Sequence, residues 1–401
     1  MVHVKALLLE NIHVDATPIF ERAGIEVVRH AGAMDEAELA EALPGVHLLG
    51  IRSGTKVTEA VLDAAPDLLA VGAFCIGTNQ IDLAGAAVRG VAAFNAPFSN
   101  TRSVVELAIA EMISLTRRLT EKNDALHRGL WDKSAKGAHE MRGRTLGIIG
   151  YGNIGSQLSV LAEAIGMGVV YYDTADKLPM GNARKVGSVD ELLTLADVVT
   201  LHVDGRVGNA GLFEAKQFAA MKPGAVFLNL SRGFVVDTEA LAEQIRSGHL
   251  AGAAIDVFPV EPKAQGDEFT SVLRGLPNVI LTPHVGGSTE EAQQDIGRFV
   301  SAKLRDYITT GGTSLSVNLP PVALESHTTT GRLALLHHNT PGVLATINQL
   351  LAEHDVNIEG QVLATRDHLG YVLTDIGAAC TPDVVAALQK MPETVRLRVL
   401  G

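Results

Sequence analysis

The sequence predicts an α/β protein with two Rossmann-like parallel-sheet domains, followed by a small ferredoxin-like domain of βαββαβ order. Short runs rich in Val, Leu, Ile and Ala alternate with helix-periodic stretches over residues 1–100, and the same alternation restarts at Arg144. After a stretch rich in Gly, Ser, Thr and Pro at 311–331, the order becomes strand, helix, strand, strand, helix, strand. These observations predict two parallel sheets and one small mixed layer.

Composition limits the class of protein. The chain has 401 residues, of which 47% are hydrophobic and 19% charged, as is typical of a globular protein with two or three domains. Its two cysteines, Cys75 and Cys380, are too few for a disulfide framework and favour a reducing compartment. The net charge of −12 argues against nucleic-acid partners, and the sequence has neither a signal-peptide pattern nor an apolar run of membrane-spanning length. We therefore expect a cytoplasmic protein without nucleic-acid or membrane partners.

Two long helical patterns suggest how the domains are connected. The first predicts one helix from Arg102 to Gly129, which Asn100 and its two neighbours in sequence can cap, and Trp131 beyond it is interpreted as a packing residue. The second, over residues 288–311, is long enough to return to the first domain.

These connections predict the domain boundaries. We expect a discontinuous substrate-binding domain of residues 1–100 and 287–318, which encloses a nucleotide-binding domain of residues 101–286. The ferredoxin-like domain is expected over residues 329–401.

The second domain begins with a dinucleotide-binding pattern. In "GYGNIG", Gly150, Gly152 and Gly155 follow the strand-like "TLGII" and precede a helical stretch, and the next strand ends at Asp173, 18 residues after Gly155. The three glycines permit a tight turn, close approach of a pyrophosphate and close packing of helix on strand. An acid at this position accepts hydrogen bonds from ribose hydroxyls and repels a 2′-phosphate, so the pattern favours NAD over NADP.

Three residues suited to hydride-transfer chemistry follow later strands. Arg232, Glu261 and His284 each come after an apolar run, and the carboxyl ends of parallel strands share one edge of a sheet. A histidine can take the hydroxyl proton of a 2-hydroxy acid, a carboxylate can orient the ring, and an arginine can bind the substrate carboxylate. Taken alone, His284 in "LTPHVGGST" is more simply a surface loop residue, so the interpretation rests on the combination.

The motifs "GYGNIG", "LSRG", "AAIDVFPVEP" and "LTPHVGGST", with "CIGTNQIDLAGAAVRGV" and "FNAPFSNTRSVVE", cover nearly the whole chain. Together they resemble the D-isomer-specific 2-hydroxy acid dehydrogenase family, in the form with a C-terminal ACT domain. The resemblance implies NAD-dependent oxidation of 3-phospho-D-glycerate to 3-phosphooxypyruvate, the first step of L-serine biosynthesis.

The resemblance also implies roles for individual residues. Arg232 would contact the substrate carboxylate and carbonyl, Glu261 would orient the histidine, and His284 would exchange the proton. The implied cofactor contacts are Gly150, Gly152, Asn153, Ile154, Gly155, Asp173, Leu230, Ser231, Arg232, Asp256, His284, Val285, Gly286 and Gly287. The implied substrate residues are Arg52, Ser53, Asn100 and Lys133, of which Lys133 would reach a neighbouring subunit's site. No metal site is expected.

The sequence departs from the family beside the adenosine. After "TLHV" the family usually continues with a proline, whereas this chain reads "DGRVGNAG" from Asp204 to Gly211. We expect this change to alter the loop at that end of the cofactor.

The C-terminal stretch resembles ACT domains that sense amino acids. The resemblance implies feedback by L-serine bound through His337, Asn339 and Asn357, and assembly into a homotetramer. Two other functions remain open: another D-2-hydroxy acid enzyme, such as a hydroxypyruvate, glyoxylate or 2-oxoglutarate reductase, and a non-enzymatic NAD-sensing scaffold. Arg52 and the ACT tail favour the phosphorylated substrate over the first, and a complete acid–histidine pair disfavours the second.

Overall fold

The computed structural model describes residues 3–262, 266–325, 331–377 and 380–400. The chain forms two compact units, Met1–Ser99 with Gln293–Gly401, and Asn100–Ala292. Residue 329, at which the sequence predicted the start of the last domain, lies outside the described residues. Within the described ranges, no helix combines the length and the apolar character needed to cross a membrane.

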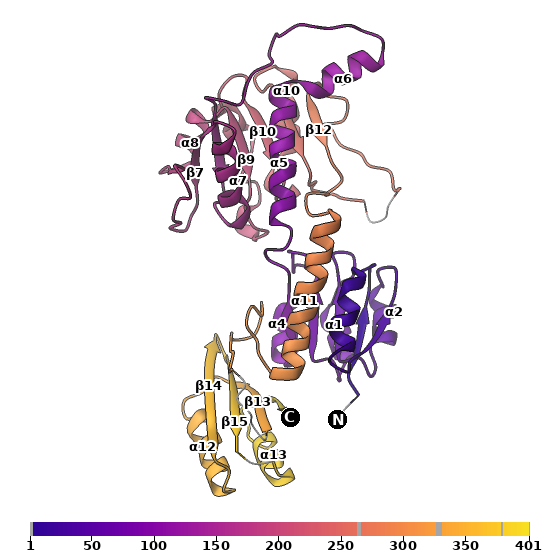
Figure 1. The fold of residues 1–401 in the computed structure, drawn as a ribbon, viewed down its shortest axis with the longest axis vertical. Coiled ribbons are helices and arrows are strands. Elements are labelled where there is room, and N and C mark those ends of the chain that lie inside the picture. The colour runs from indigo at the N-terminus through magenta and orange to yellow at the C-terminus, as the bar shows by residue number, and fades with distance from the viewer. Residues whose placement is uncertain (1–2, 263–265, 326–330, 378–379, 401) are drawn as a thin grey trace. The chain divides into compact units, whose positions relative to one another are not determined.

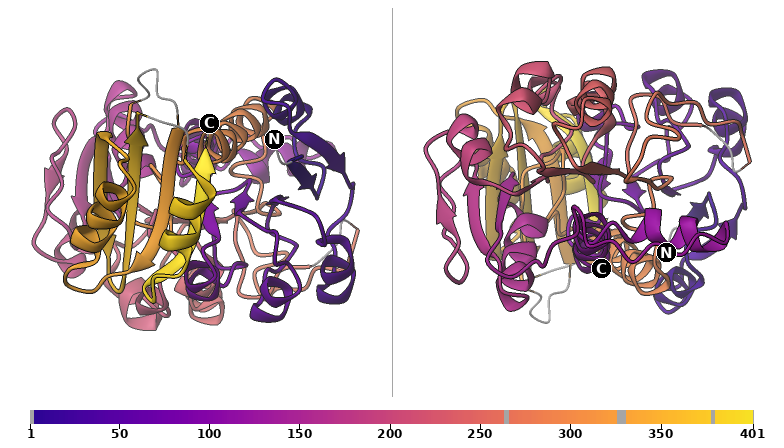
Figure 2. Two further views of the ribbon diagram at one scale, coloured as in Figure 1. Left: turned by 90° about the horizontal axis from the view of Figure 1, so that it is seen from below. Right: turned by 90° about the horizontal axis from the view of Figure 1, so that it is seen from above.

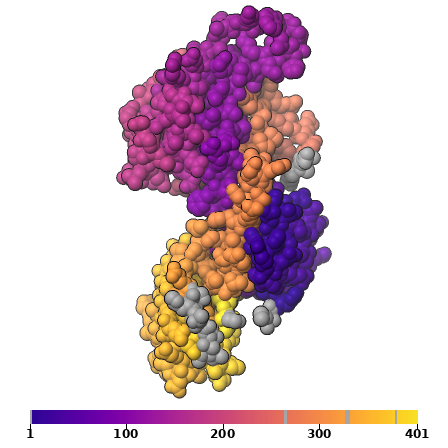
Figure 3. Space-filling model, in the orientation of Figure 1, coloured from indigo at the N-terminus to yellow at the C-terminus, as the bar shows by residue number. Residues whose placement is uncertain are grey.

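The first unit contains a five-stranded parallel sheet in the order β2-β1-β3-β4-β5 (Figure 1). The strands are β1 (Lys5–Leu8), β2 (Glu26–Arg29), β3 (Leu48–Ile51), β4 (Ala70–Ala73) and β5 (Ala92–Phe94). The helices are α1 (Thr17–Glu21), α2 (Glu36–Ala42), α3 (Glu59–Asp63), α4 (Leu83–Val88) and the long α11 (Glu290–Thr310). A Cβ added to Gly72 of β4 would lie 2.7 Å from Val300, so α11 packs tightly on this sheet. The indigo and orange surfaces in Figure 3 show that distant parts of the sequence build this layer.

The second unit contains a seven-stranded parallel sheet in the order β12-β11-β10-β9-β6-β7-β8. The strands are β6 (Thr145–Ile149), β7 (Gly168–Tyr172), β8 (Arg184–Lys185), β9 (Val198–Leu201), β10 (Val226–Asn229), β11 (Gly252–Ile255) and β12 (Val279–Leu281). The helices are α5 (Thr101–Thr116), α6 (Leu119–His127), α7 (Asn153–Ala164), α8 (Val189–Leu195), α9 (Ala215–Ala220) and α10 (Thr238–Arg246). Strand order reverses between β6 and β9, and ligands of open parallel sheets bind at such a switch point.

The single helix predicted from Arg102 to Gly129 is wrong. α5 ends at Thr116, and α6 begins only after Arg118, whose φ of 53° is left-handed and ends a right-handed helix. α6 buries none of its own side chains, and Trp131 beyond it is 76% exposed rather than packed. The expected capping by Asn100 is also absent, because its side chain makes no capping hydrogen bond to α5.

The C-terminal part of the first unit has the predicted βαββαβ order, which is confirmed. Its elements are β13 (Gly331–His338), α12 (Val343–Glu353), β14 (Ile358–Arg366), β15 (Leu369–Ile376), α13 (Pro382–Gln389) and β16 (Thr394–Leu400). The strands form an antiparallel sheet in the order β14-β15-β13-β16, and Figure 2 shows both helices on one face of it. Leu335, Ile347, Leu351 and Val372 fill the layer between sheet and helices.

The other face of this small sheet packs against the rest of the first unit. Arg396 of β16 donates to the carbonyl of Leu68. Arg398 donates to the carbonyls of Tyr307 and Ile308, and both of these bonds are 3.0 Å long. The Arg398 guanidinium also lies over the Tyr307 ring, 4.3 Å from its centroid. Arg398 is thus a cation at the C-terminal end of α11, where it interacts favourably with the helix dipole. The contacts of both arginines fix the small sheet to the rest of the unit.

Candidate active site

The glycine turn between β6 and α7 is shaped by close backbone approach. Gly150 has a φ of 93°, and a Cβ there would lie 2.5 Å from the carbonyl oxygen of His202. A Cβ on Gly155 would lie 2.4 Å from the carbonyl oxygen of Gly150. Both positions therefore require glycine. A Cβ on Gly152 would meet no atom within 4 Å, so this glycine faces open space.

That open space is suited to a pyrophosphate. Gly152 is the N-cap of α7 and offers no side chain to the first turn, so the backbone N–H groups of Asn153 and Ile154 have no side-chain cap. A helix N-terminus without a cap presents N–H donors and a partial positive charge to an anion. The residues present thus fit a dinucleotide cofactor at the switch point of the sheet.

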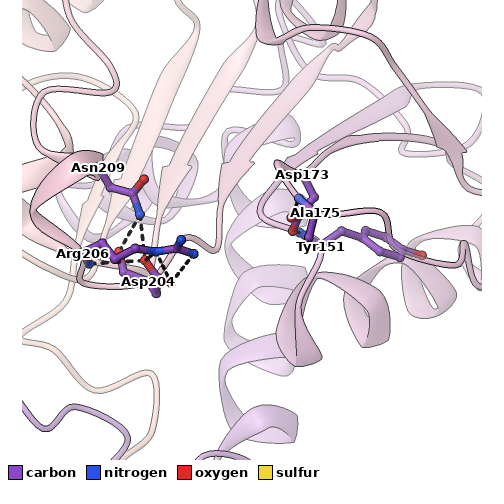
Figure 4. Close-up of polar contacts among 6 residues, drawn as sticks. All are labelled: Tyr151, Asp173, Ala175, Asp204, Arg206 and Asn209. Carbon is purple, nitrogen blue, oxygen red and sulfur yellow. Dashed lines mark hydrogen bonds and ion pairs between the residues drawn. The ribbon is translucent and has the colours of Figure 1, made fainter. Parts of the chain in front are cut away.

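Asp173 lies at the end of β7, beside the glycine turn. Its Oδ2 accepts a hydrogen bond from the backbone N–H of Tyr151 at 2.8 Å, and its Oδ1 accepts one from Ala175 at 2.8 Å (Figure 4). These bonds fix the carboxylate next to the place where the pyrophosphate-binding turn begins. Each carboxylate oxygen retains acceptor capacity for a ribose hydroxyl.

His202 directly follows strand β9, and the sequence analysis missed it. Its Nε2 lies 3.0 Å from the Thr200 hydroxyl, and its Nδ1 is buried without a partner among the described residues. Burial lowers the pKa of His202 to about 4, so the ring is neutral at physiological pH. The available signal was its place directly after an apolar strand, in "TLHV".

Asn229, a second residue that the sequence analysis missed, organises the turn after β10. It is fully buried; its Oδ1 accepts from the Ser231 backbone N–H at 3.1 Å and from the Ser231 hydroxyl at 2.7 Å. Its Nδ2 donates to the carbonyl of Arg232 at 3.0 Å. A Cβ on the next residue, Gly233, would lie 1.9 Å from the Phe258 carbonyl carbon, so this turn contacts the loop after β11 directly.

Asp256 joins the loops after β11 and β12. Its side chain is buried and accepts from the Thr282 hydroxyl at 2.6 Å and from the backbone N–H groups of Val285 and Gly286 at 2.8 and 2.9 Å. A carboxylate with three donors is a rigid anchor. Asp256 therefore fixes the turn that carries His284.

His284 and Glu261 form a hydrogen-bonded pair. The Nδ1 of His284 lies 2.9 Å from the Oε2 of Glu261, and the Oε1 of Glu261 accepts from the Phe258 backbone N–H at 3.1 Å. The side chains are 51% and 37% exposed. The Nε2 of His284 has no protein partner within the part of the chain that the structure describes, so it is the atom available to a substrate.

The pair perturbs both titrations. The hydrogen bond that Glu261 accepts raises the pKa of His284 above its ordinary 6.5, and this effect exceeds the lowering caused by burial. Burial alone would raise the pKa of Glu261, but the bond from His284 and the charges around it lower that pKa below 4.5. The interaction thus favours an imidazolium beside a carboxylate.

Arg232 belongs to the same cluster. Its Nη1 donates to the carbonyl of Ser231 at 2.7 Å, and its charge acts on the pKa values of both Glu261 and His284. The loops after β10, β11 and β12 are neighbours in the sheet order, which explains why they bring these three side chains together. Leu230, which precedes Ser231, is buried under the turn.

The predicted substrate residues Arg52 and Ser53 lie in the loop after β3 of the first unit. Glu10, which the sequence analysis missed, holds this loop: its carboxylate accepts from the backbone N–H groups of Arg52, Gly54 and Thr55 at 3.0, 2.8 and 3.0 Å. The signal was an acid directly after the apolar run of β1. Ser53 is exposed and Arg52 is half-buried, so both side chains can reach a ligand.

The other two predicted substrate residues belong to the second unit. Asn100 precedes α5 and lies beside the histidine loop, since a Cβ on Gly287 would be 2.3 Å from its Nδ2. Lys133 is exposed on the segment after α6. Across the described ranges, no hydrogen bond or ion pair joins Lys133 to another predicted site residue.

Two of the three predicted effector residues, His337 and Asn339, lie at one end of the small domain's sheet, beside Gly370, whereas Asn357 lies at the opposite end, where its carbonyl accepts from the Gly377 backbone N–H. His337 is only 2% exposed; its Nδ1 lies 2.8 Å from the carbonyl of His338, and its Nε2 is buried without a described partner. Asn339 donates to the carbonyl of Asp367 at 3.4 Å, and Asn357 is exposed just before β14. No described hydrogen bond joins Asn357 to the other two. The described residues contain no group of three or more His, Cys, Asp or Glu side chains placed to hold a metal.

Comparison with known proteins agrees with this geometry. Residues 109–286 match the NAD binding domain of D-isomer specific 2-hydroxyacid dehydrogenases, and residues 333–396 match an AHAS small subunit-like ACT domain. The chain is 48% identical over 398 residues to D-3-phosphoglycerate dehydrogenase of Haemophilus influenzae, covering 99% of this chain and 97% of the relative. It is 47% identical over 397 residues to that of Dictyostelium discoideum, with the same coverage. The structure of D-lactate dehydrogenase from Aquifex aeolicus complexed with NAD and lactic acid superimposes with a TM-score of 0.66 at 25% identity, covering 76% of this chain and 95% of that one.

Proposed function

Because the chain belongs to the D-3-phosphoglycerate dehydrogenases of the D-isomer specific 2-hydroxyacid dehydrogenase family, we propose that it oxidises 3-phospho-D-glycerate to 3-phosphooxypyruvate with NAD. The observation that carries the proposal is the His284–Glu261 pair beside Arg232, within the unit whose glycine turn fits a dinucleotide. NAD, when bound, supplies the acceptor for the hydride that leaves the substrate carbon.

The chain's own residues handle the proton and the charge. His284 takes the hydroxyl proton at Nε2, because its Nδ1 is engaged by Glu261. The Glu261 carboxylate holds the ring in one orientation and stabilises the imidazolium that results. Arg232 binds the substrate carboxylate and polarises the oxygen that becomes the carbonyl.

We assign the substrate's phosphate to the loop of Arg52 and Ser53. This loop offers the guanidinium of Arg52 and the hydroxyl of Ser53, both suited to an anion. Three hydrogen bonds from the loop to Glu10 supply the rigidity that such a site requires. Asn100 and Lys133 are proposed as further substrate contacts, with Lys133 acting on a neighbouring subunit.

His284→Gln is the direct test. We expect kcat for 3-phospho-D-glycerate to fall by about 10²–10⁴-fold, the usual contribution of a general base, while the affinity for NADH is retained. His30→Gln is the matched control, because His30 is exposed and lies in the first unit outside the proposed machinery. Unchanged turnover in His284→Gln would refute the catalytic assignment and favour a nicotinamide-sensing scaffold.

Substrate choice separates this proposal from the other reductases of the family. If the loop of Arg52 and Ser53 binds phosphate, D-glycerate without its phosphate should have a much lower kcat/KM than 3-phospho-D-glycerate. Equal kcat/KM values for the two would contradict the assignment, and a preference for glyoxylate, hydroxypyruvate or 2-oxoglutarate would identify one of those reductases instead.

We further propose that L-serine binds at the small domain and inhibits the enzyme. A zwitterionic ligand needs both donors and acceptors, which His337 and Asn339 supply at one end of the sheet; Asn357, at the opposite end of the same sheet, would join such a site only from a second subunit. The buried Nε2 of His337 without a described partner supports a ligand at the His337 end of the domain. Isothermal titration with L-serine tests this directly, and the absence of binding would refute it.

The exposed apolar segment from α6 onward supports a homo-oligomer, which we propose to be a tetramer. Large apolar side chains of α6 and of the segment that follows it are each more than half exposed: Leu126, Leu130 and Trp131. Apolar side chains that gather on one exposed segment are typical of a protein–protein interface. Sedimentation equilibrium measures the subunit number, and a single-chain mass would exclude the proposal.

A further inference from the structure

The loop after β9 carries an arginine, Arg206, that lies outside the His284–Glu261–Arg232 cluster. This is the segment from Asp204 to Gly211, in which η2 (Val207–Asn209) forms one short 3-10 turn. Arg206 and Asn209 both turn their side chains onto Asp204 (Figure 4). The contacts among these three residues determine the direction in which the guanidinium of Arg206 points.

Asp204 holds the guanidinium in place. The Nε of Arg206 lies 2.9 and 2.8 Å from the two carboxylate oxygens of Asp204, and Nη2 lies 2.7 Å from Oδ2. Asn209 donates to the same carboxylate at 2.9 Å and to the Asp204 carbonyl at 3.0 Å. A bidentate pair with a third tether restrains an arginine far more than a single surface contact does.

One edge of the guanidinium remains open. Among the described residues, the Nη1 of Arg206 has no partner, and the side chain is 72% exposed. In Figure 4 the guanidinium extends from its own loop toward the side on which Asp173 lies. The pKa of Arg206 is raised, chiefly by the hydrogen bond to Asp204 and additionally by the charge of Asp173, so the two groups interact electrostatically.

The sheet order relates this loop to the cofactor. β7, which ends at Asp173, and β9, which leads into Asp204, are the two neighbours of β6 and its glycine turn. Asp173 would therefore hold the adenosine ribose of a dinucleotide bound at the switch point, and the Asp204–Gly211 loop would lie on the other side of the glycine turn from Asp173. Gly205 of this loop is close to the catalytic cluster as well, because a Cβ there would lie 3.3 Å from the Nε of Arg232.

We propose that Arg206 is a second specificity residue of the adenosine site, a restrained cation that favours a ribose 2′-phosphate and that Asp173 outweighs in the native chain. This inference rests on the proposed function only through the identity of the cofactor. Rossmann enzymes that accept NADP commonly place an arginine beside the ribose, and those that accept NAD place an acid there. This chain has both groups.

The two charges act in opposite directions on a 2′-phosphate. The carboxylate of Asp173 repels the phosphate and accepts hydrogen bonds from the free hydroxyls of NAD. The open Nη1 edge of Arg206 offers two N–H donors to a phosphate oxygen, and Asp204 occupies only the Nε and Nη2 edge. Removal of the Asp173 charge should therefore expose a binding preference for NADP that is already built into the fold.

Equilibrium binding of NADH and NADPH, followed by the fluorescence of the reduced nicotinamide, tests this without any substrate. The proteins are the native chain, Asp173→Asn, Arg206→Gln and the double variant. We expect Asp173→Asn to lower the ratio Kd(NADPH)/Kd(NADH) by about 100-fold. Addition of Arg206→Gln should raise that ratio again by about tenfold, because one charge-assisted contact to the phosphate is lost.

The controls separate local from general effects. Arg246→Gln removes the same charge from the C-terminal end of α10, where the chain turns toward the amino end of β11, and should leave the ratio unchanged. If Arg206→Gln weakens the binding of NADH and of NADPH by the same factor, or changes the binding of neither, the inference is refuted. If Asp173→Asn fails to fold, Asp173→Ser replaces it. If neither variant folds, the comparison of the ratio Kd(NADPH)/Kd(NADH) between the native chain and Arg206→Gln decides. A native chain that does not bind NADH would instead refute the proposed cofactor, so the two failures are distinct.

Discussion

At the level of single residues, His284 lies in an uncommon backbone conformation that its neighbours maintain. Its φ of 55° is left-handed, and its backbone N–H donates to the Thr282 carbonyl at 3.0 Å. Asp256 compensates by accepting the N–H groups of the two residues that follow His284. The turn aims the ring at Glu261, so local backbone strain contributes to the geometry of the proposed base.

The pH dependence of oxidation should report this pair. Only neutral His284 can accept a proton, and Glu261 raises its pKa, so we expect kcat/KM to rise with pH through a pKa above 6.5. Glu261→Gln removes the charge that favours the imidazolium, so the rising limb should move to lower pH while the maximal rate falls. Measurement of kcat/KM over roughly pH 5 to 9 checks this, and a limb that does not move would contradict it.

The same shifts give a sign for stability. The pKa of His284 is raised, so its contribution is present at low pH and is lost as pH rises through the folded-state value. The pKa of Glu261 is lowered, so its contribution is present above 4.5 and is lost as pH falls. The pair therefore stabilises the fold between these limits. The side chains are partly exposed, which keeps the effect small.

At the level of elements, three loops at adjacent strand ends behave as one assembly. Asn229 shapes the loop after β10, Gly233 brings that loop against Phe258 after β11, and Asp256 joins β11 to the loop after β12. None of these contacts is to a ligand. Their effect is to restrain the positions of Arg232, Glu261 and His284 before any substrate arrives, which is the condition for efficient general-base catalysis.

The glycine turn permits a prediction that separates folding from binding. Gly152→Ala should destabilise the fold by less than about 1 kcal/mol, since its Cβ would meet nothing within 4 Å. The same methyl group would occupy the space offered to the pyrophosphate, so Kd for NADH should rise about tenfold or more.

Gly168→Ala is the matched control for this prediction. It also faces open space, with its nearest neighbour at 4.0 Å, but lies at the amino end of β7, away from the turn. Thermal unfolding and NADH titration of both variants provide the comparison. An unchanged Kd in Gly152→Ala would mean that the pyrophosphate binds elsewhere.

At the level of the whole molecule, the small domain is joined to the first unit by polar contacts as well as apolar ones. Arg396 is half-buried, and desolvation lowers its pKa; its described partners are backbone carbonyls, among them those of Leu68 and Pro66. The hydroxyl of Tyr371 donates to the Gly311 carbonyl at 2.7 Å. A conformational change caused by an effector in this domain would therefore be transmitted through a rigid contact.

Arg396→Ala tests that transmission. The lost hydrogen bonds should destabilise the chain by about 1–3 kcal/mol and leave kcat without effector unchanged. The fold-inhibition at saturating L-serine should decrease by about fivefold or more, which corresponds to loss of roughly 1 kcal/mol of coupling. Arg22→Ala is the control, since Arg22 is exposed and its side chain, among the described residues, bonds only to the Pro18 carbonyl of its own helix. Full inhibition of Arg396→Ala would show that the contact does not carry the signal.

Local patterns in the sequence were sufficient for the fold class and for the cofactor turn. Strand and helix periodicity, the spacing of Gly150, Gly152 and Gly155, and the acid at Asp173 depend on contacts between near neighbours in the chain, so they can be recognised without a structure. The positions of Arg232, Glu261 and His284 after apolar runs made them candidates, and the family resemblance implied their roles. Neither could supply the distances that join them.

The tertiary structure decided the rest, because those features depend on contacts between distant residues. The chain changes direction at Arg118 without a glycine or proline to mark it, so periodicity alone extended one helix across two. The roles of Asn229 and Glu10 are visible only in the folded chain, where each side chain hydrogen-bonds to the backbone of a loop. The sequence by itself determined which side chains are available for the chemistry, and the packing of loops onto neighbouring strands determined which of them meet.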